Sequence, residues 1–212
     1  MSAGTIVITG ASAGIGRACA LRFLDAGWTV VLLARRSDRL AEIAGNRPQA
    51  LAIGCDVSDP EAVSAAFAQA LARTGRIDVL FNNAGVFTPA AAIDDVPLED
   101  WLQSVAVNLN GMFLCARAAY AAMRRQQPRG GRIINNGSIS AHTPRPGSVC
   151  YTTTKHAITG LTRTLALDGR EHNIACGQID IGNARTELLE NHVARLRAAD
   201  PAADVPPMID VE

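Results

Sequence analysis

The sequence predicts an α/β fold, a doubly wound parallel sheet in a three-layer αβα arrangement, contained in a single domain over residues 1–212. Short apolar runs of strand length alternate with helical stretches from one end of the chain to the other. That alternation is typical of parallel strands joined by right-handed helical crossovers. No internal repeat, low-complexity segment or linker interrupts it, so we expect one domain.

Six strands are predicted, each from a short apolar run. The first run, TIVIT, stops at Gly10, as a fully buried parallel strand should. In chain order the strands are Thr5 to Thr9, Trp28 to Ala34, Gln49 to Cys55, Asp78 to Asn82, Arg132 to about Ser138, and Asn173 to Ile181.

Six helical stretches separate and follow these strands. The clearest start signal is Asp59-Pro60-Glu61, because proline is well suited to the first helical position after an acidic N-cap. The predicted helices run from about Gly14 to Ala26, Asp38 to Gly45, Asp59 to Thr74, Leu98 to Gln126, Gly147 to Asp168, and from after Ala184 to about Ala199, with a proline-rich tail beyond.

The composition argues against several classes of function. The 20 basic and 20 acidic residues give a formal net charge of zero, and no basic stripe is interleaved with aromatic residues, so we expect no nucleic-acid partner. The apolar runs are too short for a membrane span, and the N-terminus has no secretory leader, which predicts a cytoplasmic protein without a membrane partner. Five scattered cysteines lack zinc-like spacing, so we expect no metal site.

A glycine-rich turn, Gly10-Ala11-Ser12-Ala13-Gly14-Ile15-Gly16, lies between the first strand and the first helix. Glycines at these spacings allow a sharp turn and a close approach to a ligand, and a helix N-terminus offers free N–H groups and partial positive charge to a phosphate. The turn therefore predicts a dinucleotide pyrophosphate site. The alternative is an ordinary tight turn.

Tyr151 and Lys155 lie four residues apart in a predicted helix, which places both side chains on one face. An ammonium beside a phenol favours the tyrosinate, and lowering the phenol pKa from about 10 to about 7 requires roughly 4 kcal/mol. A tyrosine with that pKa exchanges a proton near neutral pH. A solvated helix face is the alternative for this pair taken alone.

These motifs occur together in one order: the TGxxxGIG spacing of Thr9 to Gly16, Asn82-Asn83-Ala84-Gly85, Asn108, Ser138, and Tyr151-x-x-x-Lys155. From about Thr5 to Thr186 the chain resembles the short-chain dehydrogenase/reductase family in its compact, non-extended type. The resemblance implies a Rossmann fold and hydride transfer between a nicotinamide cofactor and a carbonyl or alcohol substrate.

The resemblance also implies four catalytic roles. Tyr151 would be the general acid/base, Lys155 would lower its pKa and bind the nicotinamide ribose, and Ser138 would hold the substrate oxygen. Asn108 would position a water that links Lys155 to solvent, with a purely structural helix kink as the alternative.

The residues after the second strand bear on the choice of nucleotide. Ala34 occupies the position where an acidic residue would bind the ribose hydroxyls of NAD, and Arg35-Arg36 follow with no carboxylate there to repel a 2′-phosphate. We therefore predict a preference for NADP(H), with NAD(H) possible, and a solvated arginine pair as the alternative. The resemblance adds further cofactor contacts at Asp56, Val57, Asn83, Ala84, Gly85, Ile181 and Thr186. We expect Asn82 instead to satisfy main-chain groups between strands, a structural role.

Two departures from the family pattern stand out. Ile181-Gly182 replaces the usual Pro-Gly, and the chain stops at Glu212 without the usual seventh strand and last helix. The family implies a homodimer or homotetramer in which the helices carrying Asn108 and Tyr151 pack against their mates. The competing functions are a catalytically silent NAD(P)-binding sensor or scaffold and a sugar-nucleotide epimerase or dehydratase of the extended type.

Overall fold

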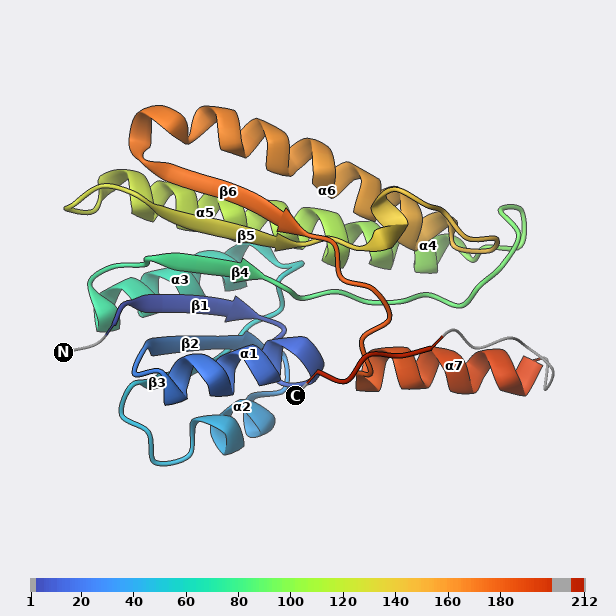
Figure 1. The fold of residues 1–212 in the computed structure, drawn as a ribbon, viewed down its shortest axis with the longest axis horizontal. Helices are drawn as coiled ribbons and strands as arrows, with labels where there is room; N and C mark the ends of the chain where they lie inside the picture. Colours follow the sequence, from blue (N-terminus) through green and yellow to red (C-terminus); the bar gives the residue numbers. More distant parts are fainter. Residues whose placement is uncertain (1–2, 200–206, 212) are drawn as a thin grey trace.

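The computed structural model describes residues 3–199 and 207–211. They contain one parallel six-stranded sheet in the order β3-β2-β1-β4-β5-β6, with helices on both faces, as the sequence predicts (Figure 1). The strands are β1 (Thr5–Thr9), β2 (Thr29–Ala34), β3 (Ala50–Gly54), β4 (Val79–Asn82), β5 (Gly131–Asn136) and β6 (Ile174–Ile179). The helices are α1 (Gly14–Asp25), α2 (Ser37–Ala44), α3 (Pro60–Thr74), α4 (Leu98–Ser104), α5 (Met112–Arg125), α6 (Val149–Asp168) and α7 (Glu187–Ala199).

Two apolar layers hold the helices to the sheet. On one face α3 and α5 bury side chains such as Phe67 and Met123 against the strands, and Leu165 of α6 packs at the edge of the same cluster. On the other face α1 and α2 bury Leu24 and Leu40. The alternation along β1 explains this division, because Val7 faces the first layer whereas Ile6 and Ile8 face the second.

The long helix predicted from Leu98 to Gln126 is interrupted by a π-helical segment, Val105–Gly111, between α4 and α5. This segment contains Asn108 and Gly111, the two residues least suited to a regular helix interior. A Cβ at Gly111 would lie 2.8 Å from Cγ2 of Val57, so glycine permits the close approach of this segment to the turn that follows β3. The sequence prediction of one continuous helix was wrong at this point because tertiary contacts of these two residues outweigh regular helix geometry.

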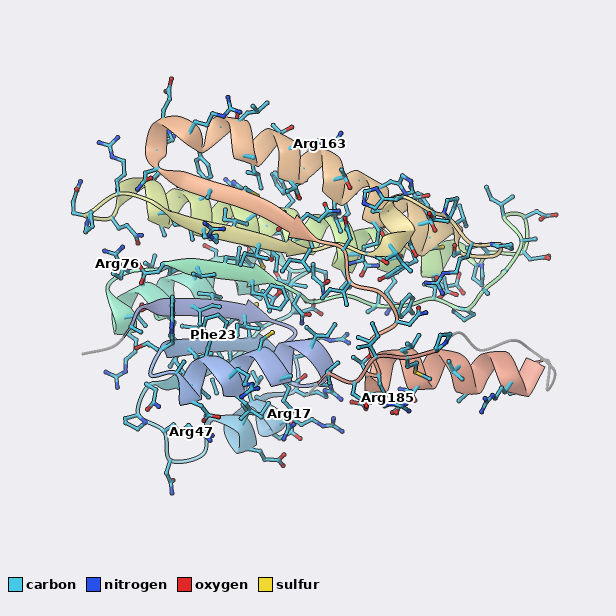
Figure 2. All side chains as sticks on the ribbon, in the orientation of Figure 1. Arg17, Phe23, Arg47, Arg76, Arg163 and Arg185 are labelled. Atoms are coloured by element: carbon cyan, nitrogen blue, oxygen red, sulfur yellow. The ribbon has the colours of Figure 1, made fainter. Side chains whose placement is uncertain are left out.

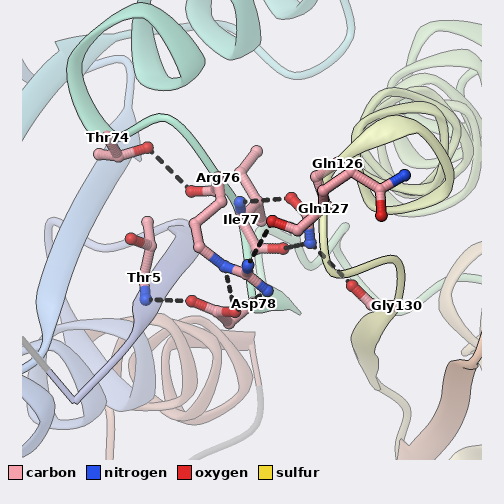
Figure 3. A network of polar contacts seen from close by, with 8 residues as sticks. All are labelled: Thr5, Thr74, Arg76, Ile77, Asp78, Gln126, Gln127 and Gly130. Carbon is pink, nitrogen blue, oxygen red and sulfur yellow. Dashed lines mark hydrogen bonds and ion pairs between the residues drawn. The ribbon is translucent and has the colours of Figure 1, made fainter.

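A polar network stabilises the end of the sheet at which the strands begin (Figure 3). Oδ2 of Asp78 accepts a hydrogen bond from the main-chain N–H of Thr5 at 2.8 Å, and Oδ1 of Asp78 accepts one from Nε of Arg76 at 2.7 Å. Gln126 binds both main-chain groups of Ile77, accepting from its N–H at 3.0 Å and donating to its carbonyl at 2.9 Å. The network ties the start of β4 to β1 and to the end of α5.

The opposite end of the sheet, at the carboxyl ends of the strands, lies next to α7; the strand arrows in Figure 1 point toward it. Figure 2 shows Arg185 near the start of α7, far from Arg76 at the other end of the molecule. Ile209 pairs with Ala184 in an isolated bridge, so part of the tail lies against the segment that follows β6. In the part of the chain that the structure describes, no helix combines the length and apolar character that a membrane span requires.

Candidate active site

A cleft of about 440 Å³ opens at the carboxyl ends of the strands, and it is lined from both sides of the point where the strand order reverses between β1 and β4. Most of the residues that the sequence predicts for the site line this cleft. They are Gly10, Ser12, Ala13, Gly14, Ile15, Arg35, Arg36, Asp56, Val57, Asn83, Ala84, Gly85, Ser138, Tyr151, Lys155, Ile181 and Thr186. Gly16 and Asn108 are buried outside the lining.

The amino end of α1 fits a bound phosphate group. Its N-cap, Ala13, makes no side-chain capping hydrogen bond, and its first turn contains no acidic residue. In contrast, α3 is capped by Asp59 and carries Glu61 in its first turn. The first turn of α1 lines the cleft, so its N–H groups and partial positive charge suit a dinucleotide pyrophosphate.

Two glycines of this turn allow close packing around the phosphate site. Gly10 has a φ of 65°, and a Cβ there would lie 2.9 Å from Cα of Ala84. Gly14 has a φ of 50°, and a Cβ there would lie 2.9 Å from Cγ2 of Thr186. Larger residues would therefore push apart the three segments that form this end of the cleft.

The arginines after β2 lie at the same end of the cleft. Nε and Nη2 of Arg36 donate to Oγ of Ser12 at 3.3 and 3.1 Å, which places this guanidinium over the glycine-rich turn. Oε2 of Glu187 lies 3.4 Å from Nη1 of Arg36 and 3.0 Å from Nη1 of Arg39. A carboxylate therefore faces the arginines, although none occupies the position after β2 in the sequence. Glu187 comes from α7, and local sequence could not reveal this tertiary contact.

The turns after β3 and β4 complete the predicted nucleotide side. Oδ1 of Asp56 accepts hydrogen bonds from the hydroxyl of Ser58 at 2.7 Å and from its main-chain N–H at 3.0 Å, and these bonds hold the pKa of Asp56 below its ordinary value. The side-chain amide of Asn83 donates to the carbonyl of Thr9 at 2.9 Å, which fixes the Asn83–Gly85 turn against β1. Asn82 donates to the carbonyl of Met112 at 2.9 Å and to Oδ1 of Asn135 at 3.2 Å, consistent with the structural role expected for it.

Tyr151 and Ser138 meet at the other end of the cleft. The Ser138 side chain lies beside the phenol in the cleft lining, and the ring of Phe87 lies against the Tyr151 ring with centroids 4.1 Å apart. Burial raises the pKa of Tyr151 above its ordinary value, while the interaction with Ser138 and the charge of Arg145 act in the opposite direction and are outweighed. The expectation of a phenol pKa lowered by Lys155 was therefore wrong for the protein chain itself.

Burial, which acts on Lys155 as well, accounts for this difference. Nζ of Lys155 lies 5.5 Å from the centre of the Tyr151 ring and donates to the carbonyl of Asn136 at 2.6 Å. The side chain is buried on α6, one turn after Tyr151 as predicted, and burial lowers its pKa from 10.5 to about 8. Burial thus favours the neutral form of both groups, since it raises the pKa of Tyr151 and lowers the pKa of Lys155.

Asn108 lies buried outside the cleft lining and connects segments that form the site. Its side chain is fully buried, and its amide accepts from the N–H of Val86 at 2.8 Å and donates to the carbonyl of Val86 at 3.0 Å. It also lies within hydrogen-bonding distance of Ser104 and of Thr154, the residue before Lys155. Asn108 therefore links the loop after β4 to the helix that carries the tyrosine and the lysine.

Asp180 is a site residue that the sequence reasoning missed. Its Oδ1 accepts a hydrogen bond from the main-chain N–H of Ser138 at 3.0 Å, and its Oδ2 lies 2.7 Å from Nε2 of His142. Its position just before Ile181-Gly182, at the carboxyl end of a predicted strand, was the signal that could have identified it. The carbonyl of Ile181 accepts from Ile139 at 3.4 Å, so this loop is held by main-chain contacts without a proline.

Comparison with known proteins gives a consistent result. The model of the short chain dehydrogenase family matches residues 4–196. A 3beta-hydroxysteroid dehydrogenase of Mediterraneibacter gnavus is 36% identical over 204 residues, which cover 93% of this chain and 73% of that protein.

Two solved structures extend the comparison to cofactor complexes. A 3-ketoacyl-(acyl-carrier-protein) reductase from Brucella melitensis complexed with NADH has a TM-score of 0.88 and 28% identity, over 99% of this chain and 86% of that one. ElxO with NADP bound has a TM-score of 0.84 and 27% identity, over 93% and 80% of the two chains. The single parallel sheet agrees with these similarities, and the chain belongs to the short-chain dehydrogenase/reductase family of oxidoreductases.

Proposed function

We propose that this protein transfers a hydride between NADP(H) and a carbonyl/alcohol substrate, with Tyr151 as the general acid/base. The observation that carries the proposal is the arrangement of the cleft. The Tyr151 phenol, the Ser138 hydroxyl and the Lys155 amine lie at one end, and the uncapped α1 terminus and the arginines lie at the other. The names of the relatives, a hydroxysteroid dehydrogenase and a ketoacyl reductase, support a carbonyl/alcohol pair.

The protein has to place the proton, because the bound nicotinamide cofactor supplies or accepts the hydride. In carbonyl reduction, Ser138 holds the substrate oxygen by a hydrogen bond and Tyr151 donates its proton to that oxygen. The raised pKa of Tyr151 supports this direction, since a phenol that is protonated at neutral pH is ready to donate. Lys155 then stabilises the tyrosinate that remains.

For the cofactor, we propose that Arg35 and Arg36 recognise a 2′-phosphate and so favour NADP(H), with NAD(H) as the weaker alternative. The guanidinium fork of Arg36 over Ser12 supports this role, because it suits bidentate binding of a phosphate. Asp56 and Val57 are assigned to the adenine, Asn83 to Gly85 to the adenosine ribose, and Ile181 to the nicotinamide carboxamide, while Thr186 is assigned to the cofactor beside Gly14. Asn108 is assigned the positioning of the loop after β4 and of a water near Lys155.

The proposal includes a pH dependence. If charged Lys155 stabilises the tyrosinate, carbonyl reduction requires its protonated form. Because its pKa is about 8, we expect kcat/KM for reduction to be highest below pH 8 and to decline as the pH rises through that value. A kcat/KM that stays constant from pH 6.5 to pH 9.5 would contradict this role.

The decisive experiment is a spectrophotometric screen of carbonyl and alcohol compounds with NADPH and NADH, using the wild-type protein and Tyr151→Phe. We expect turnover with at least one substrate, higher kcat/KM with NADPH, and a loss of several orders of magnitude in Tyr151→Phe with cofactor affinity retained. Undiminished turnover in Tyr151→Phe would refute the assignment of the proton donor. Dinucleotide binding without any turnover would favour a sensor or scaffold instead.

We further propose a homodimer or homotetramer built on the outer faces of α5 and α6. Phe113 on α5 is 49% exposed and Leu167 on α6 is 58% exposed, and both border a shallow depression that also contains Tyr120 and Leu165. Light scattering of Phe113→Asp against the wild-type protein tests this face, with a shift toward monomer as the expected result.

A further inference from the structure

Asp180, the residue that follows β6, joins several elements of the site through one carboxylate. Oδ1 accepts hydrogen bonds from the main-chain N–H of Ser138 at 3.0 Å and from Nε2 of Gln178 at 2.6 Å. Oδ2 lies 2.7 Å from Nε2 of His142, in the segment between β5 and α6. Ser138 is therefore held by a charged acceptor, a stronger bond than one to a neutral carbonyl.

The main chain around Ser138 is packed directly against this carboxylate. A Cβ on Gly137 would collide with Oδ1 of Asp180, so glycine is needed for the close approach. Main-chain bonds on either side, from Gly137 to Ile179 at 2.9 Å and from Ile139 to Ile181 at 3.4 Å, align the two segments. The carboxylate lies between these bonds and fixes the position of the Ser138 main chain relative to the end of β6.

The charges around Asp180 reach the proton-transfer pair. Burial acts to raise the pKa of Asp180, but bonds from His142, Gln178 and Ser138 outweigh it and hold that pKa below its ordinary value, so the group is ionised at neutral pH. Nζ of buried Lys155 donates to the carbonyl of Asn136, which pairs with Ile179 just before Asp180, and the negative charge of Asp180 opposes the effect of burial on the pKa of the amine. Arg145, on the same segment as His142, acts on Tyr151.

We infer that Asp180 is a positioning residue of the site: it fixes Ser138 beside the Tyr151 phenol and provides a negative charge next to the Asn136–Ile179 pair that Lys155 contacts. The inference deepens the proposed function and rests on it for the reaction itself. The two effects are separable, because one depends on an acceptor oxygen and the other on charge.

Two substitutions separate them. Asp180→Asn keeps an acceptor oxygen for the N–H of Ser138 and removes the charge, whereas Asp180→Ala removes both. We expect Asp180→Ala to lower kcat roughly 10- to 100-fold, the cost of a small misplacement of reacting groups, and Asp180→Asn to lower it less. The Kd for NADPH should change less than about twofold in both, since the other end of the cleft is untouched. Asp25→Asn, at the far end of α1, is the matched control for loss of an exposed carboxylate.

The charge effect has a readout that needs neither substrate nor cofactor. Lys155 is the only lysine in the sequence, so protein labelled with ¹³Cε-lysine gives one side-chain NMR signal. We expect this signal to titrate at lower pH in Asp180→Asn than in the wild-type protein, and at the wild-type pH in Asp25→Asn.

An unshifted Lys155 titration in Asp180→Asn, or wild-type kcat in a folded Asp180→Ala, would overturn the inference. If Asp180→Ala does not fold, Asp180→Asn decides through its titration and its kcat. Failure of the proposed function would look different, because Tyr151→Phe would keep its activity while the lysine titration still responded to Asp180.

Discussion

Replacing Lys155 by methionine should stabilise the protein while it removes activity. The side chain is 4% exposed, and its pKa is lowered from 10.5 to about 8 because burial disfavours the charged ammonium. A lysine with that depressed pKa destabilises the folded state at every pH below 8, where the amine must be protonated inside the protein. Methionine keeps a similar unbranched stem without the charge.

The magnitude follows from the two pKa values. Each pKa unit corresponds to about 1.4 kcal/mol, so the shift from 10.5 to about 8 costs about 3 kcal/mol of folding free energy at pH 7. The cost is fully present below the folded-state pKa and disappears as the pH rises toward the unfolded-state value. It should shrink by about 2 kcal/mol between pH 7 and pH 9.5. The hydrogen bond to the carbonyl of Asn136 offsets about 1 kcal/mol of it.

Urea unfolding at pH 7 and pH 9.5 measures this effect. We expect Lys155→Met to be more stable than the wild-type protein by about 2 kcal/mol at pH 7, and to lose this advantage at pH 9.5. Arg163→Met is the matched control, because Arg163 is exposed on the same helix and its replacement removes one positive charge without emptying a buried site (Figure 2). A destabilised Lys155→Met at pH 7, or a difference that is equal at both pH values, would refute the reasoning.

Two further predictions concern the opposite ends of the molecule. Glu187→Gln should tighten binding of 2′,5′-ADP roughly 2- to 5-fold and leave binding of 5′-AMP unchanged, because Glu187 competes with a 2′-phosphate for Arg36. Calorimetry measures both affinities, with Glu190→Gln as the control. Equal effects on the two nucleotides would contradict the competition. Gln126→Leu should lower the free energy of unfolding by about 2 to 4 kcal/mol, because it leaves both main-chain groups of buried Ile77 unpaired. In the control Gln127→Leu, at an exposed position, the free energy of unfolding should stay within about 0.5 kcal/mol of the wild-type value. Similar urea midpoints for the two variants would contradict the role of the network.

Features that depend on neighbouring residues were predictable from the sequence. The TIVIT run gives β1, Asp59 caps α3 as expected, and Tyr151 and Lys155 share one face of α6 because helix geometry alone places them there. The glycine-rich turn lies in the cleft for a similar reason, since its position between a buried strand and a helix brings it to the carboxyl edge of the sheet.

Features that depend on distant residues were not predictable. Glu187 approaches Arg36 across 151 positions of sequence, and Asp180 binds Ser138 across 42. The pKa of Tyr151 was predicted with the wrong sign because the charge of a nearby lysine can be inferred from spacing, whereas the degree of burial of the phenol cannot. The π-helical segment likewise depends on the contact of Asn108 with Val86 in another loop.

The two ends of the strands differ in how fully their polar groups are paired, and the predictions above follow from that difference. At the end shown in Figure 3, carboxylate, guanidinium and amide groups find partners, so removing one costs stability. At the opposite end α1 is uncapped and Lys155 is held in a site that disfavours its charge. Both features weaken the fold and both suit the binding and chemistry of an anionic dinucleotide, as expected where function is maintained at the expense of stability. The two substitutions worked out above should therefore differ: Gln126→Leu lowers the urea midpoint and spares kcat, whereas Lys155→Met removes kcat while the midpoint at pH 7 rises.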